Sequence, residues 1–238
     1  MAHGANETEI KLAVESTQAA RRLLRAAGFT VSRRRVFESN VIFDTPKLTL
    51  RKAATLLRVR KAGGLSTITY KGRPAVAKHK SREELELEIA DAGTMSAIIE
   101  RLGLSPVFRY EKQRTEYRQS RGAGMAMLDE TPVGVYLELE GEPRWIDRTA
   151  RQLGFSEQDY IVHSYARLYL EWCRRKQVKA GDMVFGRAGK KARGQEAVKK
   201  SGGRRKRLSH KNAGPCAPKW DRRFRLSTPR SERVSHNF

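Results

Sequence analysis

The sequence is poor in the residues and segments that define several classes of protein. Its two cysteines, Cys173 and Cys216, lie in dissimilar regions, with no Cys-x-x-Cys spacing and no paired histidines. Neither a disulfide framework nor a zinc site is therefore expected. No run of about 18 apolar residues occurs, and the amino terminus has no apolar segment of signal-peptide length. We accordingly expect no membrane span and a cytoplasmic location.

A glycine-rich phosphate loop is also missing. The Gly63-Gly64 pair is followed by Leu65, and not by the Gly-Lys-Ser/Thr of nucleotide-binding loops. Its place between two extended segments predicts a hairpin turn instead.

Acidic residues are scarce relative to basic ones, with 26 Asp and Glu against 49 Lys and Arg and a net charge of +23. The excess is concentrated at one end: residues 174–238 hold 21 basic and 4 acidic residues, or +17, and residues 1–173 hold 28 and 22, or +6. From Arg174 the chain loses periodicity and becomes rich in Gly, Pro, Lys and Arg, which cannot bury enough apolar area to offset the entropy of ordering. We predict a folded domain over 1–173 and a disordered basic tail over 174–238.

The charge of the predicted tail indicates attachment to nucleic acid, polyphosphate or another anionic surface. Trp220 and Phe224 are candidates for stacking on bases. A solvated extension without a specific partner is the alternative.

Charged and apolar residues alternate in Glu7-Thr8-Glu9-Ile10-Lys11. In a strand, the two glutamates and the lysine share one face, and Ile10 shares the other with Leu12. Carboxylates bind hard divalent cations, and such cations neutralise phosphate, so the pattern indicates a metal-phosphate site. The solvated face of an ordinary half-buried strand looks the same. Repetition of the pattern decides between the two interpretations.

The alternation recurs along residues 1–140 and predicts about eight strands. Acids dominate the first, fifth and last of them, and bases dominate the third, fourth and sixth. Like charges on one strand cost free energy unless an opposite charge offsets them, so this sorting indicates a bound cation and a bound polyanion. The predicted strands are 7–12, 34–43, 57–60, 68–71, 84–89, 112–118, 125–129 and 137–140.

Short amphipathic helices accompany these strands. Ser16 is a candidate N-cap for a helix that ends before Gly28. Because several strands follow one another without a helix, we predict an α+β fold in which an eight-stranded antiparallel β-barrel has a charged interior and an apolar exterior covered by helices. The predicted helices are 16–27, 94–102, 146–153 and 164–173.

Seven motifs in order resemble those of the CYTH domain, the family of triphosphate tunnel metalloenzymes. The resemblance covers roughly residues 5–172 and implies a tunnel of eight antiparallel strands. Class IV adenylate cyclases, thiamine triphosphatases and inorganic triphosphatases belong to that family. The motifs are Glu7-x-Glu9-x-Lys11, Phe43-Asp44-Thr45, Leu57-Arg58-Val59-Arg60, Tyr70-Lys71-Gly72, Lys112-x-Arg114, Leu128-Asp129 and Glu138-x-Glu140.

The resemblance implies three sets of site residues. The expected ligands of Mg²⁺ or Mn²⁺ are Glu7, Glu9, Asp129, Glu138 and Glu140, and Glu86 is a further candidate beside Glu84 and Glu88. The expected triphosphate ligands are Lys11, Arg58, Arg60, Lys71, Lys112 and Arg114. Lys11, Glu9 and Lys71 carry the expected catalytic roles.

The expected activity is metal-dependent hydrolysis of a triphosphate-containing substrate. Class IV adenylate cyclase is the main alternative, because both reactions use the same triphosphate contacts. Thiamine triphosphatase remains open, with Trp145, Tyr136 or Phe108 as candidates to stack on thiamine or to pack in the core. RNA triphosphatase and a non-catalytic module that binds polyphosphate or nucleic acid also remain open. A homodimer is compatible with such a barrel.

Two positions depart from the family pattern. Class IV cyclases often carry His-Phe before the first motif, where this chain has His3-Gly4. Many members have a substrate-contacting lysine before Ser-Tyr, where this chain has His163 before Ser164-Tyr165. His163 is therefore expected to be a surface or capping residue.

Overall fold

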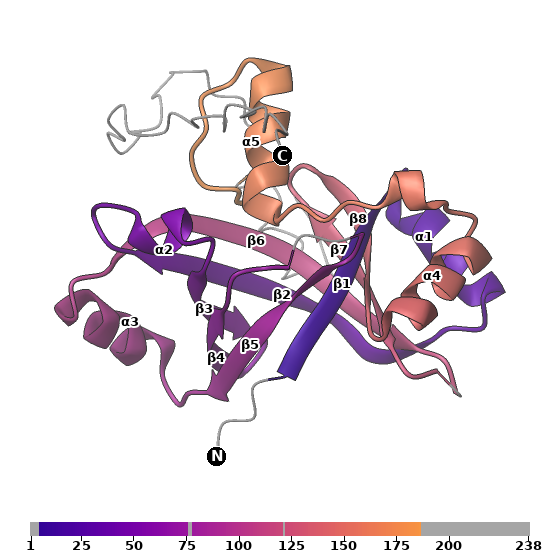
Figure 1. The fold of residues 1–238 in the computed structure, drawn as a ribbon, viewed down its shortest axis with the longest axis horizontal. Helices are drawn as coiled ribbons and strands as arrows, with labels where there is room; N and C mark the ends of the chain where they lie inside the picture. The colour runs from indigo at the N-terminus through magenta and orange to yellow at the C-terminus, as the bar shows by residue number, and fades with distance from the viewer. Residues whose placement is uncertain (1–4, 76–77, 121, 187–238) are drawn as a thin grey trace, which may run out of the picture. The chain divides into compact units, whose positions relative to one another are not determined.

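The structure is a computed structural model that describes residues 5–75, 78–120 and 122–186. Within these ranges, eight antiparallel strands form a closed barrel in the order β1-β5-β4-β3-β2-β6-β7-β8 (Figure 1). The predicted α+β class and antiparallel barrel are confirmed. The strands are β1 (Ala5–Val14), β2 (Thr30–Asp44), β3 (Leu56–Ala62), β4 (Leu65–Lys71), β5 (Lys80–Glu88), β6 (Ser105–Arg118), β7 (Met125–Thr131) and β8 (Gly134–Glu140).

Both faces of strand β1 are buried. Ile10 and Leu12 point outward into the apolar core and are 0% exposed. Glu9 and Lys11 point to the barrel interior and are almost as deeply buried. The two-residue period therefore separates an outer apolar layer from an inner charged one, as the sequence predicted.

The helices pack on the outside of the barrel. Ser16 caps α1, where its hydroxyl accepts a hydrogen bond from the Ala19 amide at 3.2 Å. Helix α3 starts earlier than predicted because Asp91 caps it, and α4 starts earlier because Pro143 is preorganised for the first helical turn. The helices are α1 (Thr17–Ala26), α2 (Thr49–Lys52), α3 (Ala92–Arg101), α4 (Pro143–Gln152) and α5 (Tyr165–Lys176), with a 3₁₀ turn at Glu157–Asp159.

The short helix α2 was not predicted. The Asp44 carboxylate accepts hydrogen bonds from the amides of Thr45, Leu50 and Arg51 at 2.7–2.9 Å. Asp44 of the Phe43-Asp44-Thr45 motif thus holds a turn at the end of β2. The Gly63-Gly64 hairpin is confirmed, since it joins β3 to β4 with Gly63 in the left-handed region.

Three apolar clusters attach the helices to the barrel. Helices α1 and α4 cover β1, β7 and β8, with Leu24 and Ile146 fully buried against them. Helix α3 covers β3 and β4 through Ile99. Helix α5 packs through Tyr165 and Tyr169 against aromatic side chains of β6 and β8. No helix of the described ranges combines the length and apolar character that crossing a bilayer requires.

Ordered structure continues beyond Cys173, where the sequence predicted disorder to begin. Helix α5 runs to Lys176, and residues 178–186, which we call the strap, lie along β6. Met183 is 0% exposed and exchanges backbone hydrogen bonds with Arg109 and Glu111 at 2.9 Å. The predicted disorder is therefore wrong for 174–186, because a few specific contacts order a segment whose composition is polar. The rest of the predicted tail, with Trp220 and Phe224, lies outside the described residues.

Candidate functional site

The strand order gathers like charges into two arcs of the barrel wall. Strands β8, β1 and β5 are neighbours and carry most of the inward acids. Strands β4, β3, β2 and β6 follow in that order and carry most of the inward bases, and β7 closes the circle between β6 and β8. The register between β1 and β8 brings Glu9 opposite Glu140 and Lys11 opposite Glu138. The inward acids are Glu7, Glu9, Glu84, Glu86, Glu138 and Glu140, and the bases of the other arc are Arg58, Arg60, Lys71, Lys112 and Arg114.

Acids and bases of the interior are paired with one another. Lys11 Nζ lies 3.1 Å from Glu9 Oε1 and 3.4 Å from Glu138 Oε1. Lys71 Nζ lies 2.5 Å from both Glu7 Oε2 and Glu84 Oε2. A ligand with both cation and phosphate would have to exchange these internal pairs for its own charges.

Glu140 differs from the other inward acids because it makes no ion pair with a described residue. Burial, followed by the charges of Glu7 and Glu138, raises the pKa of Glu140 to about 7. Glu9 is buried too, but the positive charge of Lys11 keeps its pKa below the ordinary value. Burial would also raise the pKa of Glu7, yet its hydrogen bond with Glu84 and the charge of Lys71 lower it to about 2. Among these acids, Glu140 is thus the one whose pKa the neighbouring carboxylates raise and no direct ion pair with a described residue lowers.

Asp129 lies among the bases and not among the acids. It is 0% exposed and accepts two hydrogen bonds from Arg114 at 2.7 Å, one from Lys112 at 2.9 Å and one from the Tyr165 hydroxyl at 2.6 Å. With its oxygens so occupied, Asp129 orients Arg114 and Lys112 toward the interior. Its expected role as a metal ligand stays a prediction.

The two arginines of β3, Arg58 and Arg60, contact the same acid, Glu86. Glu86 Oε2 accepts from Thr69 at 2.7 Å, from Arg58 at 3.4 Å and from Arg60 at 3.5 Å. Arg58 also donates to the hydroxyls of Thr69 and Tyr110. Glu86 therefore faces the expected phosphate ligands Arg58 and Arg60.

The interior residues that were not predicted as site residues include Lys80, Arg82, Glu38, Tyr110 and Tyr165. Lys80 and Arg82 continue the alternation of Glu84 and Glu86 toward the start of β5, so the period itself contained that information. Lys80 Nζ lies 2.5 Å from Glu9 Oε1, and burial together with Lys11 and Arg82 lowers the pKa of Lys80 to about 8. The remaining three are Glu38 and Tyr110, for which strand alternation is the sequence signal, and Tyr165, which begins helix α5 and belongs to the Ser164-Tyr165 pair of the family pattern.

Glu38 is a buried acid in the basic arc. Its carboxylate lies 3.5 Å from Lys112 Nζ and 3.9 Å from an Arg60 nitrogen, and it is 3% exposed. Burial would raise the pKa of Glu38, but Lys112 and Arg114 hold it well below the ordinary value. Glu38 thus contacts cationic groups that were predicted to bind phosphate.

Other candidate residues lie away from the interior. His163 is exposed, as expected of a surface residue, and Tyr165, two positions later, is the side chain that enters the barrel. Trp145 belongs to the core under α1 and α4, and Phe108 stacks on Tyr110 in the cluster beneath α5. Core packing is therefore the observed role of both aromatics.

Comparison with known proteins identifies relatives of this chain and structures with a similar fold. A protein of Methanocaldococcus jannaschii with the provisional name adenylate cyclase is 29% identical over 134 residues, or 56% of this chain and 75% of that protein. The structure of a Vibrio parahaemolyticus protein with the same provisional name has a TM-score of 0.61 at 21% identity, covering 70% of this chain and 98% of that one.

A provisionally named adenylyl cyclase from Hippeastrum, whose structure is described as revealing a dominant triphosphatase activity, has a TM-score of 0.51 at 21% identity and covers 73% of this chain and 97% of that one. At such identities the structural likeness shows the fold. The model of the CYTH domain family matches residues 5–165, which is more than half of the sequence. Together with the closed barrel and its sorted charges, this match shows that the chain belongs to the CYTH domain family.

Proposed function

We propose that the protein hydrolyses a triphosphate-containing small molecule inside the barrel, with a divalent cation as cofactor. One observation carries the proposal: four glutamates converge on one side of an interior whose other side is lined by Arg and Lys. A site that only bound anions would have no use for the converging carboxylates.

The residues present fit a hard divalent cation. Glu140 has no cationic partner, and its neighbours Glu7, Glu9 and Glu138 all raise its pKa. Oxygen-rich, negatively charged surroundings of this kind are what Mg²⁺ and Mn²⁺ prefer. In their present positions, the side chains of the described residues form no metal-binding cluster of three or more Asp, Glu, His or Cys groups. Binding would thus require Glu9 and Glu138 to turn away from Lys11.

Glu7, Glu9, Glu138 and Glu140 are the proposed metal ligands, and Asp129 is a fifth candidate. A bound cation would neutralise phosphate oxygens and favour attack at phosphorus.

The basic arc supplies the phosphate contacts in this proposal. Arg58 and Arg114 present planar guanidinium groups that can donate two parallel hydrogen bonds to a phosphate. Lys11, Lys71 and Lys112 are mobile point charges whose present partners are carboxylates. When phosphate binds, each base exchanges a carboxylate for a phosphate oxygen, and the released carboxylates become available to the cation. Each ion of the buried interior would therefore keep a partner of opposite charge, and an unpaired buried ion would be costly in free energy.

Hydrolysis and cyclisation differ in the nucleophile. Water attacks in hydrolysis, whereas the ribose 3′-hydroxyl of ATP attacks the α-phosphorus in cyclisation and expels pyrophosphate. The triphosphatase activity described for the Hippeastrum protein favours hydrolysis. The provisional names of the archaeal and Vibrio proteins make adenylate cyclase the second candidate.

Product analysis tests the proposal. The full chain would be incubated with inorganic triphosphate or with ATP, in Mg²⁺ or Mn²⁺, and the products separated by chromatography. We expect phosphate release from triphosphate without cyclic AMP. Cyclic AMP with pyrophosphate would establish the cyclase instead, and no turnover of either substrate with either cation would contradict both candidates.

A further inference from the structure

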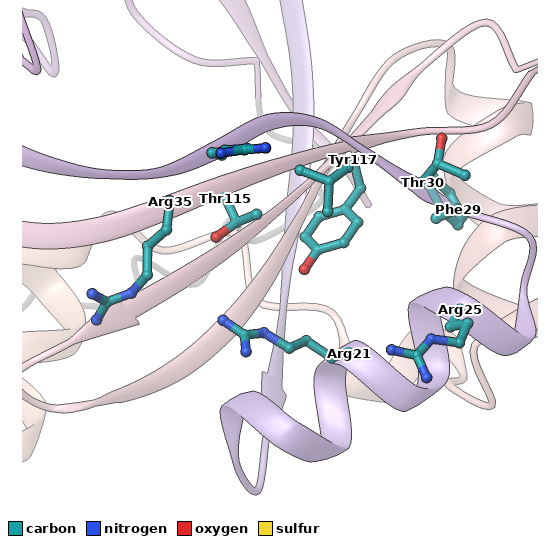
Figure 2. A pocket seen from close by; sticks show the side chains of 9 residues that line it. Arg21, Arg25, Phe29, Thr30, Arg35, Thr115 and Tyr117 are labelled. Atoms are coloured by element: carbon teal, nitrogen blue, oxygen red, sulfur yellow. The ribbon is translucent and has the colours of Figure 1, made fainter. Parts of the chain in front are cut away.

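A second pocket lies outside the barrel, between helix α1 and strands β2 and β6 (Figure 2). Thr115 and Tyr117 of β6 line it, and they alternate with Arg114, which points inward. Their partners across β7 are Leu128 and Ala126 of the outer core, so this face is the exterior one. The pocket has a volume of about 550 Å³, within the usual range for small-molecule sites.

The lining of this pocket carries positive charge only. It contains Arg21 and Arg25 of α1 together with Arg34 and Arg35 of β2, and no acidic residue. Arg35 is occupied, since it donates to both carboxylate oxygens of Glu130 at 2.8 and 3.1 Å. Among the described residues, the other three guanidinium groups have no hydrogen-bond or ion-pair partner. Such a lining repels cations and attracts anions.

Three lining residues carry hydroxyls, and that of Thr30 already donates to the Arg118 carbonyl, which leaves those of Thr115 and Tyr117. Thr115 is 4% exposed, and its Oγ1 has no hydrogen-bond partner. A buried hydroxyl without a partner destabilises a protein, and a bound water or ion is one explanation for such a group in a native structure. Figure 2 shows the hydroxyls of Thr115 and Tyr117 on the side toward Arg21. Hydroxyl and guanidinium donors therefore border one space.

We propose that this pocket binds the phosphate group of a small phosphorylated molecule of about nucleotide size. The guanidinium groups of Arg21, Arg25 and Arg34 would bind the phosphate oxygens, and the Thr115 hydroxyl would donate to one of them. Phe29 and Val31 form the apolar part of the lining, and Val31 is 53% exposed for a hydrophobic side chain. The site shares no residue with the barrel interior, so it stands independently of the proposed function.

Free phosphate and a nucleoside monophosphate supply the same chemistry, and calorimetric titration separates them. The full chain would be titrated with inorganic phosphate and with AMP at about 0.15 M salt, with EDTA present. The test variant is Arg21→Ala/Arg25→Ala, in which alanine preserves the helix. The control is Arg22→Ala, on the same helix, exposed and outside the pocket lining.

We expect saturable binding to wild type and to the control, and a loss of about tenfold or more in the double variant. Tighter binding of AMP than of phosphate would show that the apolar wall contributes. Equal binding of both would show that the site recognises phosphate alone. Equal affinity of wild type, control and double variant would overturn the proposal, because the anion would then bind elsewhere on this basic chain.

Thr115→Val gives a second readout, since valine matches threonine in shape and lacks the hydroxyl. The free variant should melt at a higher temperature, because an unpartnered buried hydroxyl is removed, yet it should bind phosphate or AMP more weakly. A higher melting temperature with unchanged affinity would show that the hydroxyl has no part in the site. Absence of saturable binding by either probe up to about 10 mM would also refute it.

Discussion

Single residues of the interior differ in whether a cation offsets their charge. Lys11 and Arg114 hold Glu138, and Lys71 holds Glu7, so these acids contribute to folding as well as to the proposed site. Glu140 has no such partner among the described residues. Removal of its charge should therefore affect metal binding without breaking an ion pair.

Glu140→Gln should lower metal-dependent turnover by about 100-fold or more while the fold is kept. The substitution should also change how the stability of the metal-free protein, measured in EDTA, depends on pH. The pKa of Glu140 is raised to about 7 in the folded state, so it makes wild type lose stability as pH rises from 5 to 8, and the variant should lack this part of the loss. Melting temperatures at pH 5 and pH 8 check this sign.

The matched control is Glu83→Gln, because Glu83 is exposed on β5 and alternates with the inward Glu84. Its turnover should equal that of wild type. Full activity in Glu140→Gln, or a loss of activity explained by unfolding, would remove the support for a metal-binding role.

Glu38 contacts Arg60 and Lys112, and in the proposed site it would compete with phosphate for both. Glu38→Gln should therefore lower the KM for triphosphate a few-fold. The free protein should lose about 1–3 kcal/mol of stability, because buried bases lose a charged partner. Saturating triphosphate should restore the melting temperature. A raised KM would instead show that Glu38 orients the bases and does not compete with the substrate.

At the scale of elements, contacts between residues far apart in sequence hold Lys78 and His79, which lie just before β5. Asp147 of α4 accepts from the Tyr160 hydroxyl at 3.0 Å and from Lys78 Nζ at 3.0 Å, and its Oδ1 lies 2.8 Å from His79 Nε2. Lys78 also contacts Glu157. The segment that precedes β5, and with it Lys80, is thus tethered to α4.

Asp147→Asn should destabilise the protein by about 1 kcal/mol or less at pH 7, because the Asp147–Lys78 pair is partly exposed. Burial opposes ionisation, but the bonds from Lys78 and His79 lower the pKa of Asp147 in the folded state. Its contribution is therefore present at neutral pH and fades as pH falls below about 4. Denaturant unfolding at pH 7 and pH 3 measures this; equal stabilities at pH 7 would contradict it.

The strap is a second element whose role can be tested. Truncation after Cys173 removes Met183 and the end of α5, and should lower stability by about 2–5 kcal/mol. Truncation after Gly186 keeps every described contact and should leave turnover of a small triphosphate unchanged. Thermal melts and steady-state kinetics of the two truncations decide. Equal melting temperatures would show that the strap adds nothing to stability.

The whole molecule joins a nearly balanced barrel to a strongly basic carboxy-terminal region. Residues 174–238 carry +17 of the +23 net charge. Charge of this density favours polyanions through counterion release, whose signature is a steep dependence on salt.

A chain that ends at Gly186 should therefore lose most of its affinity for long-chain polyphosphate or single-stranded RNA at 50 mM salt. The full chain should bind with a steep decrease between about 50 and 200 mM salt. Fluorescence anisotropy of a labelled oligomer measures both. Identical salt curves for the two chains would exclude a role of the basic region in binding these polyanions.

The sequence alone predicted the eight strands, though not all of their bounds, and the fold class, because alternation with period two is a local property of the chain; the order of its motifs predicted the family. It assigned Glu7, Glu9 and Lys11 to one face and Ile10 and Leu12 to the other, and the structure confirms this division. Local capping chemistry likewise located α1 at Ser16. Helix starts were less accurate where Asp91 or Pro143 extended the first turn.

The tertiary structure decided which charges meet. Pairing of β1 with β5 brings Lys80 to Glu9, and pairing of β2 with β6 brings Glu38 to Lys112, over separations of more than 70 residues. Packing of α5 places Tyr165 on Asp129, and the strap orders residues expected to be disordered. Alternation fixes the face of a strand on which a side chain lies. Its neighbour across the sheet depends on long-range pairing, which the whole chain decides together.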